Sequence, residues 1–325
     1  MKGSTEMKKR KDLSIVVPCF NEEEALPIFY DTVTEVVGKM GVDCEYVFVD
    51  DGSTDGTLGI LRALAAKDPN VRYVSFSRNF GKEAGIYAGL QYARGEHVAL
   101  MDADLQDPPA YLPQMYEALQ TGKYDNVATR RSTREGEPVV RSFFSRMFYR
   151  LINRMTDVPI VDAARDFRMM KRKMVDAILA TGEYNRFSKG LFSWVGFRTL
   201  WLSYDNVERV AGQTKWSFWK LFKYALEGIV NFSHAPLDIV TNAGMLMTVV
   251  AFIWAVVLIL KKLIIGNYNV SGWTSLTCII IFLGGIQLCS IGIIGQYIAR
   301  IFLETKHRPL FIVAESSDDE RAPED

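Results

Sequence analysis

Cysteine, histidine and net charge are all scarce in this sequence. Its 325 residues include 4 Cys and 3 His, and 38 Lys and Arg balance 38 Asp and Glu. A chain without a basic surplus lacks the electrostatic footprint of a nucleic-acid-binding protein, so we expect no nucleic-acid partner. The cysteines and histidines show neither zinc-ligand spacing nor a disulfide framework. We therefore expect the polar part of the chain to lie in a reducing compartment.

Long apolar runs are missing from the first 230 or so residues, and two occur in the last 90 or so. Residues 239–260 contain no charged side chain over 22 positions. A helix of that length extends about 33 Å, enough to cross a hydrocarbon core of about 30 Å. Residues 273–299 are also uncharged, and a short turn joins the two runs. The pattern predicts two transmembrane helices within residues 236–300, with buried core helices as the alternative.

No apolar segment follows the polar, basic residues 1–12, so the sequence predicts neither a signal peptide nor a transit peptide there. We expect both termini and the polar domain on the cytosolic side of the cell inner (cytoplasmic) membrane. Residues 301–325 would then form a cytosolic tail. Its last part, residues 315–325, is acidic and poor in large apolar side chains, which predicts a solvated, disordered segment.

Short β-branched runs alternate with helical patterns in the first 130 residues. The predicted strands are residues 13–17, 46–50, 71–76, 97–102 and 124–129. Such alternation predicts an α/β fold with a mainly parallel, Rossmann-like sheet, whose ligands bind at the carboxyl ends of the strands. Polar motifs follow four of these strands: PCFNEEE, DDGSTDGT, SRNFGKEAG and DADLQDPP. No G-x-G-x-x-G follows the first strand, and the glutamates there would repel a pyrophosphate, so a dinucleotide-binding domain is excluded.

Three oxygen donors follow the fourth predicted strand at alternate positions: Asp102, Asp104 and Gln106. Alternate residues of an extended segment point the same way, so these side chains could hold a hard cation such as Mg²⁺ or Mn²⁺. The cation would bridge a diphosphate and stabilise it as a leaving group. The alternative is a pair of aspartates that are solvated or cap the next helix.

The second and third strand ends carry further polar candidates. Asp50 and Asp51 could accept hydrogen bonds from a base or ribose, while Ser53 or Asp55 caps the following helix. The third strand end brings positive charge and a glycine that allows close approach of a phosphate, in the residues Arg78, Asn79, Gly81 and Lys82.

Two amphipathic segments predict contact with a membrane surface. In residues 138–156, apolar side chains share one helical face and Arg146, Arg150 and Arg154 recur on another. This pattern is typical of a helix in the headgroup region, and a core-facing helix with a basic outer side is the alternative. The second segment, residues 213–235, precedes the first apolar run and carries two tryptophans suited to the interface.

Taken in chain order, the motifs resemble glycosyltransferase family 2. The matching segments are VVPCFNEEE, VDDGSTDGT, SRNFGKEAG, MDADLQDPP, DFRMMKRK, NRFSKGLFSWVGF and VERVAGQTKWSFWKL, followed by the two apolar runs. The resemblance covers nearly the whole chain and is to the polyprenyl-phosphate branch, with the bactoprenol glucosyltransferases and dolichol-phosphate-mannose synthases. It implies a GT-A catalytic domain over residues 13–212.

The resemblance also implies roles for particular positions. It implies a nucleotide-sugar pocket of Pro18, Asn21, Glu22, Asp50, Asp51, Lys82 and Asp102, a metal site of Asp102, Asp104 and Gln106, and catalytic roles for Asp104, Asp166 and Arg209. Candidate lipid-phosphate ligands are Arg130, Arg131, Arg141, Arg146, Arg150 and Lys215. Asp166 matches the position proposed as a base. Thr214 stands where the family usually has serine, and DAAR replaces an expected glycine-containing run before Asp166.

The predicted reaction is inverting, metal-dependent transfer of a sugar from a nucleotide diphosphate donor to polyprenyl (undecaprenyl) phosphate. UDP-glucose is the first donor candidate, and GDP-mannose, UDP-galactose, UDP-GlcNAc or an aminoarabinose derivative are alternatives. An acceptor phosphate is already anionic, so Asp166 could orient a substrate instead of removing a proton. A processive synthase is disfavoured, since no Q-x-x-R-W motif occurs, and a catalytically silent membrane scaffold is the alternative from another class. Polar and glycine residues within the spans make a homo-oligomer plausible.

Overall fold

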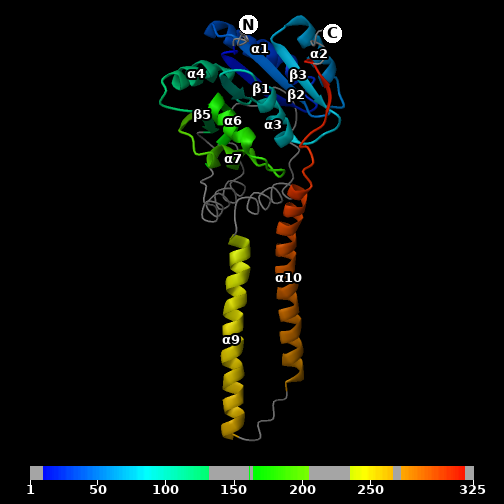
Figure 1. Cartoon of the computed structure of the whole chain (residues 1–325), viewed down its shortest axis with the longest axis vertical. Coiled ribbons are helices and arrows are strands. Elements are labelled where there is room, and N and C mark those ends of the chain that lie inside the picture. Colours follow the sequence, from blue (N-terminus) through cyan, green and yellow to red (C-terminus); the bar gives the residue numbers. More distant parts are fainter. Residues whose placement is uncertain (1–9, 132–160, 162–163, 205–234, 266–271, 319–325) are drawn as a thin grey trace, which may run out of the picture.

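The computed structural model describes residues 10–131, 161, 164–204, 235–265 and 272–318. In Figure 1 these residues form an α/β head and two long helices that extend from it. The predicted amphipathic segments, residues 138–156 and 213–235, lie outside the described residues, except for the last residue of the second.

One sheet forms the centre of the head. Within the described chain it has eight strands in the order β7-β5-β6-β4-β1-β2-β3-β8. The strands are β1 (Leu13–Cys19), β2 (Cys44–Asp50), β3 (Val71–Phe76), β4 (His97–Leu100), β5 (Asn126–Arg131), β6 (Ala164–Lys171), β7 (Thr199–Tyr204) and β8 (Val313–Ser316). The helices of the head are α1 (Ala25–Met40), α2 (Thr57–Lys67), α3 (Lys82–Tyr92), the 3-10 turn η1 (Pro109–Tyr111), α4 (Leu112–Gln120), α6 (Arg172–Ala180) and α7 (Ser188–Trp194).

The strand directions agree with the predicted sheet in the centre and differ at two other places. β4, β1, β2 and β3 are parallel to their neighbours in this group, and β5 is parallel to β7. β6 runs antiparallel between β4 and β5, and β8 runs antiparallel to β3. The carboxyl ends of β1 to β4 therefore share one edge, where the polar motifs were expected to gather.

The alternation of apolar residues along β1 fills both sides of the sheet. Ile15 and Val17 belong to the core beneath α1, and Val16 belongs to the core beneath α3. Helix α3 lies close to the sheet, because a Cβ on Gly89 would be 2.2 Å from the Cγ1 of Val16. Each fully buried aliphatic side chain of this kind stabilises the fold by about 1.5–3 kcal/mol.

The boundaries of four predicted strands are shifted. The strands expected over residues 13–17 and 46–50 cover Leu13–Cys19 and Cys44–Asp50. The strand expected over residues 97–102 ends at Leu100, and the one expected over 124–129 covers Asn126–Arg131. Strands β6, β7 and β8 had no counterpart among the sequence predictions. β6 contains Arg165, Asp166 and Arg168, and these charges hide the alternation that normally marks a strand.

The C-terminal tail is ordered where the sequence predicted disorder. Val313–Ser316 pairs with β3, and Ser316 and Ser317 are buried. The prediction was wrong for residues 315–318, because the open edge of β3 offers backbone partners to a strand that has few apolar side chains of its own. Residues 319–325 lie outside the described part of the chain.

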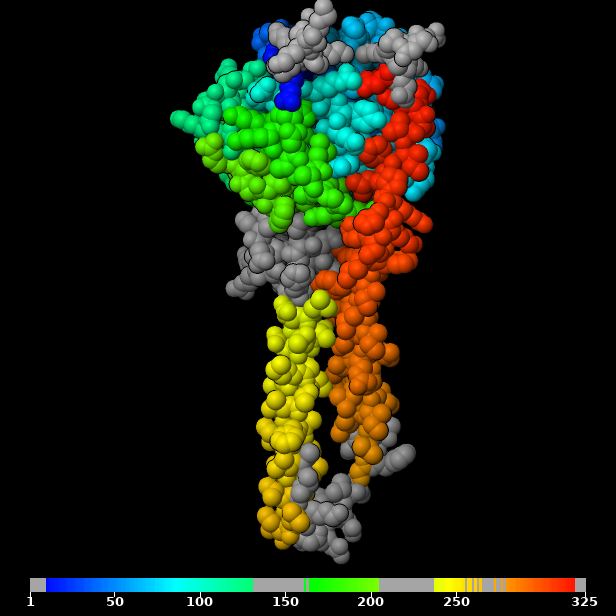
Figure 2. Space-filling model, in the orientation of Figure 1, coloured from blue at the N-terminus to red at the C-terminus, as the bar shows by residue number. Residues whose placement is uncertain are grey.

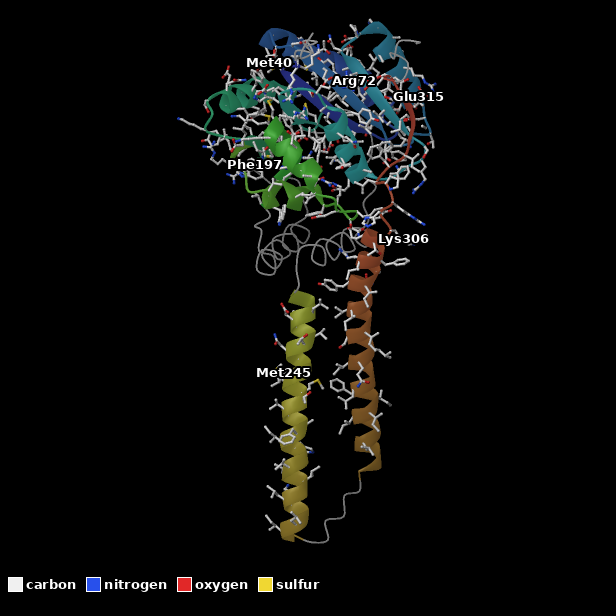
Figure 3. All side chains as sticks on the ribbon, in the orientation of Figure 1. Met40, Arg72, Phe197, Met245, Lys306 and Glu315 are labelled. Carbon is white, nitrogen blue, oxygen red and sulfur yellow. The ribbon has the colours of Figure 1, made fainter. Side chains whose placement is uncertain are left out.

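The two apolar runs are helices, α9 (Ala235–Ile265) and α10 (Trp273–Thr305). By length and composition, the stretches Leu237–Leu258 and Ile279–Thr305 are sufficient to cross a membrane. Neither of these two apolar stretches is buried inside the molecule. Figure 3 shows their side chains projecting away from the helix axes, as at Met245, so the buried-core alternative does not fit.

Candidate active site

The loops after β1 and β2 are joined by hydrogen bonds. The N–H of Asn21 donates to Ser53 Oγ at 3.0 Å, and Asn21 Oδ1 accepts from the N–H of Thr54 at 2.8 Å. The N–H of Glu22 donates to Thr57 Oγ1 at 2.9 Å. Asn21 has a φ of 56°, a left-handed conformation that asparagine tolerates better than most residues. The two loops thus form one surface at the sheet edge.

Asp50, at the end of β2, is only 1% exposed. Its oxygens accept hydrogen bonds from Ser75 Oγ at 2.7 Å and from the N–H of Ser53 at 3.1 Å. The helix cap predicted at Ser53 or Asp55 is Gly56 in the structure, and Asp55, one residue earlier, accepts from the N–H of Thr57 at 3.0 Å. Asp50 therefore fixes the loop that follows its own strand, and its contact with a nucleotide stays a prediction.

Asp51 links the second strand end to the third. It is 4% exposed and accepts hydrogen bonds from the N–H groups of Phe80, at 2.6 Å, and Gly81, at 2.9 Å. Burial raises the pKa of Asp51, and the two N–H bonds oppose that rise. The carboxylate retains lone pairs for a ligand, but its first role is to hold the start of α3.

Gly52 lets the second and third loops approach each other closely. Its φ is 65°, and a Cβ at this position would lie 2.4 Å from the carbonyl carbon of Arg78 and 2.7 Å from the nitrogen of Asn79. Only glycine fits this backbone conformation together with this contact.

Lys82 lies between two carboxylates from different strands. Its Nζ is 2.7 Å from Asp102, which follows β4, and 2.6 Å from Asp166 on β6. The sequence placed Lys82 near a base or diphosphate and gave it no protein partner. In the structure it neutralises the repulsion between Asp102 and Asp166 and keeps them together at the carboxyl edge of the sheet.

The charge states of this group follow from its geometry. Burial pushes the pKa of Asp166 upward, but Lys82 and then Lys189 outweigh burial and hold that pKa well below its usual range. For Lys82, burial acts to lower the pKa, and the carboxylates of Asp102 and Asp166 raise it above its usual range. Asp166 is therefore ionised and Lys82 protonated at neutral pH.

The segment after β4 turns where an extended run was expected. Asp104 Oδ1 accepts from the N–H of Gln106 at 3.1 Å, and Leu105 has a φ of 54°. The Gln106 side chain accepts from Arg165 at 3.1 Å. The prediction that Asp102, Asp104 and Gln106 point the same way was based on an extended segment, and it was wrong because the chain turns at Leu105.

The residues still fit a divalent cation that the substrate helps to hold. Among the described residues, no group of three or more His, Cys, Asp and Glu side chains is arranged as a metal site. Asp102 and Asp104 are both partly accessible. A magnesium-type ion commonly takes one or two carboxylates and completes its shell with substrate phosphates and water, and these two aspartates provide that.

Comparison with known proteins identifies the family. Residues 14–179 match the model of glycosyl transferase family 2. The chain is 45% identical over 301 residues to a prophage bactoprenol glucosyl transferase homolog of Escherichia coli K12, covering 93% of this chain and 98% of that protein. It is 44% identical over 301 residues to the bactoprenol glucosyl transferase of Shigella phage SfV, covering 93% and 97%. The chain belongs to glycosyltransferase family 2.

Solved structures give weaker matches. A mannosyltransferase from Pyrobaculum calidifontis, in complex with GDP-Man and Mn²⁺, is 16% identical, with 93% of this chain and 89% of that chain covered and a TM-score of 0.45. A mannosyl-3-phosphoglycerate synthase from Rubrobacter xylanophilus is 18% identical, with 68% and 73% covered and a TM-score of 0.46. The family membership rests on the sequence relatives. The head of this glycosyltransferase has the α/β GT-A fold of its family.

Two arginines of the glycosyltransferase site were not predicted from the sequence. Arg165 donates to Asp107 at 3.0 Å as well as to Gln106, and the hydroxyl of Tyr204 also donates to Asp107. Burial raises the pKa of Asp107, against the effect of Arg165. This network ties the loop after β4 to β6. The sequence feature that could have indicated this network is the arginine directly before Asp166, which ends the DAAR run that stands in place of an expected glycine-containing run.

Arg168 is the second such arginine, and it is 2% exposed. Its guanidinium lies 3.6 Å from the ring centroid of Phe192 and donates to the carbonyl oxygens of Arg165 and Asp166. Burial lowers the pKa of Arg168 to about 10, so it stays charged at neutral pH. Arg168 therefore stabilises the backbone at Arg165 and Asp166.

Only part of the predicted lipid-phosphate group can be placed. Arg130, on β5, donates to Ser203 Oγ at 3.0 Å, and Arg131 ends the same strand. Pro18 lies in β1 against Gly85 of α3. The remaining predicted residues lie outside the described residues: Arg141, Arg146, Arg150, Arg209 and Lys215.

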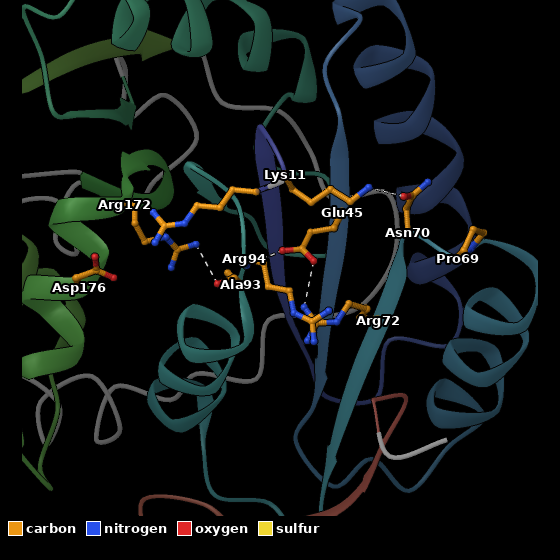
Figure 4. Close-up of a pocket in the computed structure, with 10 residues that line it drawn as sticks. Lys11, Glu45, Pro69, Asn70, Arg72, Ala93, Arg94, Arg172 and Asp176 are labelled. Carbon is orange, nitrogen blue, oxygen red and sulfur yellow. Dashed lines mark hydrogen bonds and ion pairs between the residues drawn. The ribbon is translucent and has the colours of Figure 1, made fainter. Parts of the chain in front are cut away.

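A cavity of about 530 Å³ opens at the opposite edge of the sheet, where β1, β2 and β3 begin (Figure 4). Its charged groups bind one another and the backbone. Arg72 pairs with Glu45 at 3.1 Å, and Arg172 donates to the carbonyl oxygen of Gly95 at 2.9 Å. We assign this cavity to the architecture of the head and not to substrate binding.

Proposed function

We propose that this glycosyltransferase transfers a hexose, with UDP-glucose as the first donor candidate, to a polyprenyl phosphate such as undecaprenyl phosphate. The observation that carries the proposal is the match to proteins named bactoprenol glucosyl transferase, which extends over 93% of this chain and therefore includes the apolar helices. GDP-mannose, UDP-GlcNAc, UDP-galactose and an aminoarabinose derivative are the alternative donors.

The reaction is a single displacement. An oxygen of the acceptor phosphate attacks the anomeric carbon, a new carbon–oxygen bond forms, and the bond from that carbon to the diphosphate breaks. The electron pair leaves with the nucleoside diphosphate, and the anomeric centre is inverted. Because the acceptor oxygen is already anionic, the step needs no proton removal. We therefore give Asp166 the role of an ionised orienting group that holds Lys82 in place.

Cations must bring two anionic substrates together and stabilise the leaving group. Lys82 is the described cation nearest to Asp102 and Asp166, and the pair Asp102 and Asp104 would hold Mg²⁺ or Mn²⁺. Such an ion, when bound, would neutralise charge on the leaving diphosphate. Arg130 and Arg131, with Arg209 and Lys215, are our candidates for the acceptor phosphate.

The lipid acceptor requires a membrane next to the head. We propose that α9 and α10 form a transmembrane hairpin in the cytoplasmic membrane, with the head on the cytosolic side, where the nucleotide sugar is available. β8 follows α10 and joins the same sheet as β3, which precedes α9. A hairpin returns the chain to the side from which it left, in agreement with this pairing. Self-association of the hairpins remains part of the proposal.

The test is a transfer assay with the purified full chain. Undecaprenyl phosphate, Mn²⁺ or Mg²⁺ and a panel of labelled nucleotide sugars are incubated with it, and label entering the organic phase is counted. We expect transfer from one donor, lost with EDTA and in Asp104→Ala. Binding of a nucleotide without transfer from any donor would contradict the proposal and favour the scaffold.

A further inference from the structure

The cytosolic end of α10 is bonded directly to a loop of the catalytic head. The carboxylate of Glu304, in the last turn of α10, accepts hydrogen bonds from the N–H of Tyr184 at 2.8 Å and the N–H of Asn185 at 3.4 Å. Both donors belong to the backbone, so the contact fixes the path of the loop and not a side chain. The proposed catalytic chemistry makes no use of this carboxylate.

The loop that Glu304 holds leads into the active site. It continues into α7, where the N–H of Ser188 donates to Glu83 at 2.9 Å and its hydroxyl donates to the same carboxylate. Glu83 follows Lys82, the partner of Asp166. Lys189, the next residue of α7, also acts on the charge of Asp166. A short series of contacts therefore connects the end of α10 to the pair that we place at the reaction centre.

The segment after α10 makes a second attachment, also beside α3. The ring of Phe311 stacks on Phe76, with 4.8 Å between centroids, and contacts Tyr87 of α3. The carbonyl oxygen of Ile312 accepts from the N–H of Ser77 at 2.9 Å, and β8 then pairs with β3. In Figure 2 this red segment runs along the head from the top of the orange helix. The end of α10 is thus connected to the helix that begins with Lys82 at two positions, Glu83 and Tyr87.

The distance of a lipid-borne phosphate from the bilayer is fixed. Its prenyl chain stays in the bilayer, so the phosphate remains at the headgroup level, and the donor must be presented at the matching height. A displacement of about 1 Å of reacting groups can lower a rate about 100-fold. A rigid attachment between the membrane helix and the active-site loop would supply that alignment.

We propose that Glu304 is a positioning residue that sets the height of the active site relative to the membrane through its bonds to residues 184 and 185. The inference rests on the proposed polyprenyl phosphate acceptor. A water-soluble acceptor reaches the site from any direction and does not depend on this alignment. The two kinds of acceptor therefore separate positioning from a general structural role.

The experiment uses the full chain reconstituted in phosphatidylethanolamine and phosphatidylglycerol vesicles. The kcat/KM is measured for undecaprenyl phosphate in the bilayer and for a short, water-soluble prenyl phosphate. For Glu304→Ala we expect a loss of about tenfold or more with the long acceptor, little change with the short one, and an unchanged KM for the donor. Glu304→Gln keeps an oxygen that accepts the two N–H bonds, and it should retain most of the activity.

Thr305→Ala is the matched control. The hydroxyl of Thr305 donates to the carbonyl oxygen of Phe302, in the same helix, at 3.1 Å. Removing this hydroxyl should change the kcat/KM for neither acceptor. Equal losses with both acceptors, or no loss with either, would overturn the inference. If Glu304→Ala fails to bind nucleotide, Glu304→Asp replaces it: its carboxylate is one methylene shorter, and the same split between the two acceptors must appear in it. A wild-type chain that transfers sugar to neither acceptor contradicts the proposed function itself.

Discussion

At the scale of single residues, the site depends on side chains that support one another before any substrate binds. Lys82 is 46% exposed and yet contacts two carboxylates, so water screens the pairs without separating them. Removing Lys82 would leave Asp102 and Asp166 to repel each other. The position of Asp102 after the fourth strand could be predicted from its motif, whereas Asp166 was indicated by the family resemblance alone, with no strand predicted around it. Their joint contact with Lys82 could not be predicted, because β6 is inserted antiparallel and far along the chain.

Gly52 gives the prediction that belongs to this scale. Gly52→Ala should destabilise the head by roughly 2–4 kcal/mol, because the new methyl group meets the Arg78 backbone and the residue keeps a positive φ. Thermal unfolding of the purified chain measures this. Gly59→Ala is the control, since a Cβ there meets nothing within 4 Å in helix α2, and it should stabilise by about 0.5–1 kcal/mol. Equal unfolding temperatures for the two variants would refute the close approach.

At the scale of elements, β8 is held by charge as much as by strand pairing. Arg62 contacts Glu315 through two nitrogens, at 2.8 and 2.5 Å, and Tyr73 donates to the same carboxylate at 2.5 Å. Hydrogen bonds from Arg62 and Tyr73 lower the pKa of Glu315 from 4.5 to about 2. Asp318 reaches Arg72 at 2.5 Å beyond the end of the strand.

The stabilisation by Glu315 should depend on pH with a definite sign. Its folded pKa lies below its unfolded value, so the contribution is complete above about pH 4.5 and is lost as the pH falls toward about 2. We expect Glu315→Gln to lower the unfolding midpoint at pH 7 and to match the wild type near pH 2. Glu35→Gln, which breaks the exposed pair with Lys39, should have a smaller effect at pH 7. A constant difference across this range would contradict the assignment.

The sequence predicted β1 to β5 because apolar runs and turn motifs mark them, with errors of a few residues at their ends. It did not predict β6, β7 or β8. Charged residues interrupt the apolar pattern of β6, although Phe167, Met169 and Met170 pack in the core. β8 has four residues at an open edge, and its order depends on pairing with the backbone of β3. Such strands form because of tertiary contacts, and no local sequence pattern predicts them.

At the scale of the whole molecule, the apolar helices and the sheet constrain each other. The spans expected over residues 239–260 and 273–299 are helices over Ala235–Ile265 and Trp273–Thr305. Length and absence of charge were sufficient to find them. The sequence could not reveal that the chain returns to the sheet after α10, and this return is what places both helix ends next to the head on one side.

The topology can be tested with single cysteines. In intact bacterial cells that express a chain with Cys278 and Cys289 replaced by alanine, a membrane-impermeant maleimide should label Gly272→Cys, which lies before α10 at the far end of the hairpin. Lys306→Cys, at the near end, should react only after lysis (Figure 3). Cys19 and Cys44 are buried and should contribute little background. Labelling of Lys306→Cys before lysis would exclude a cytosolic head. Protection of both sites in intact cells would exclude a hairpin that crosses the membrane. The pairing of β8 with β3 requires the ends of α9 and α10 next to the head to lie on the same side of the membrane.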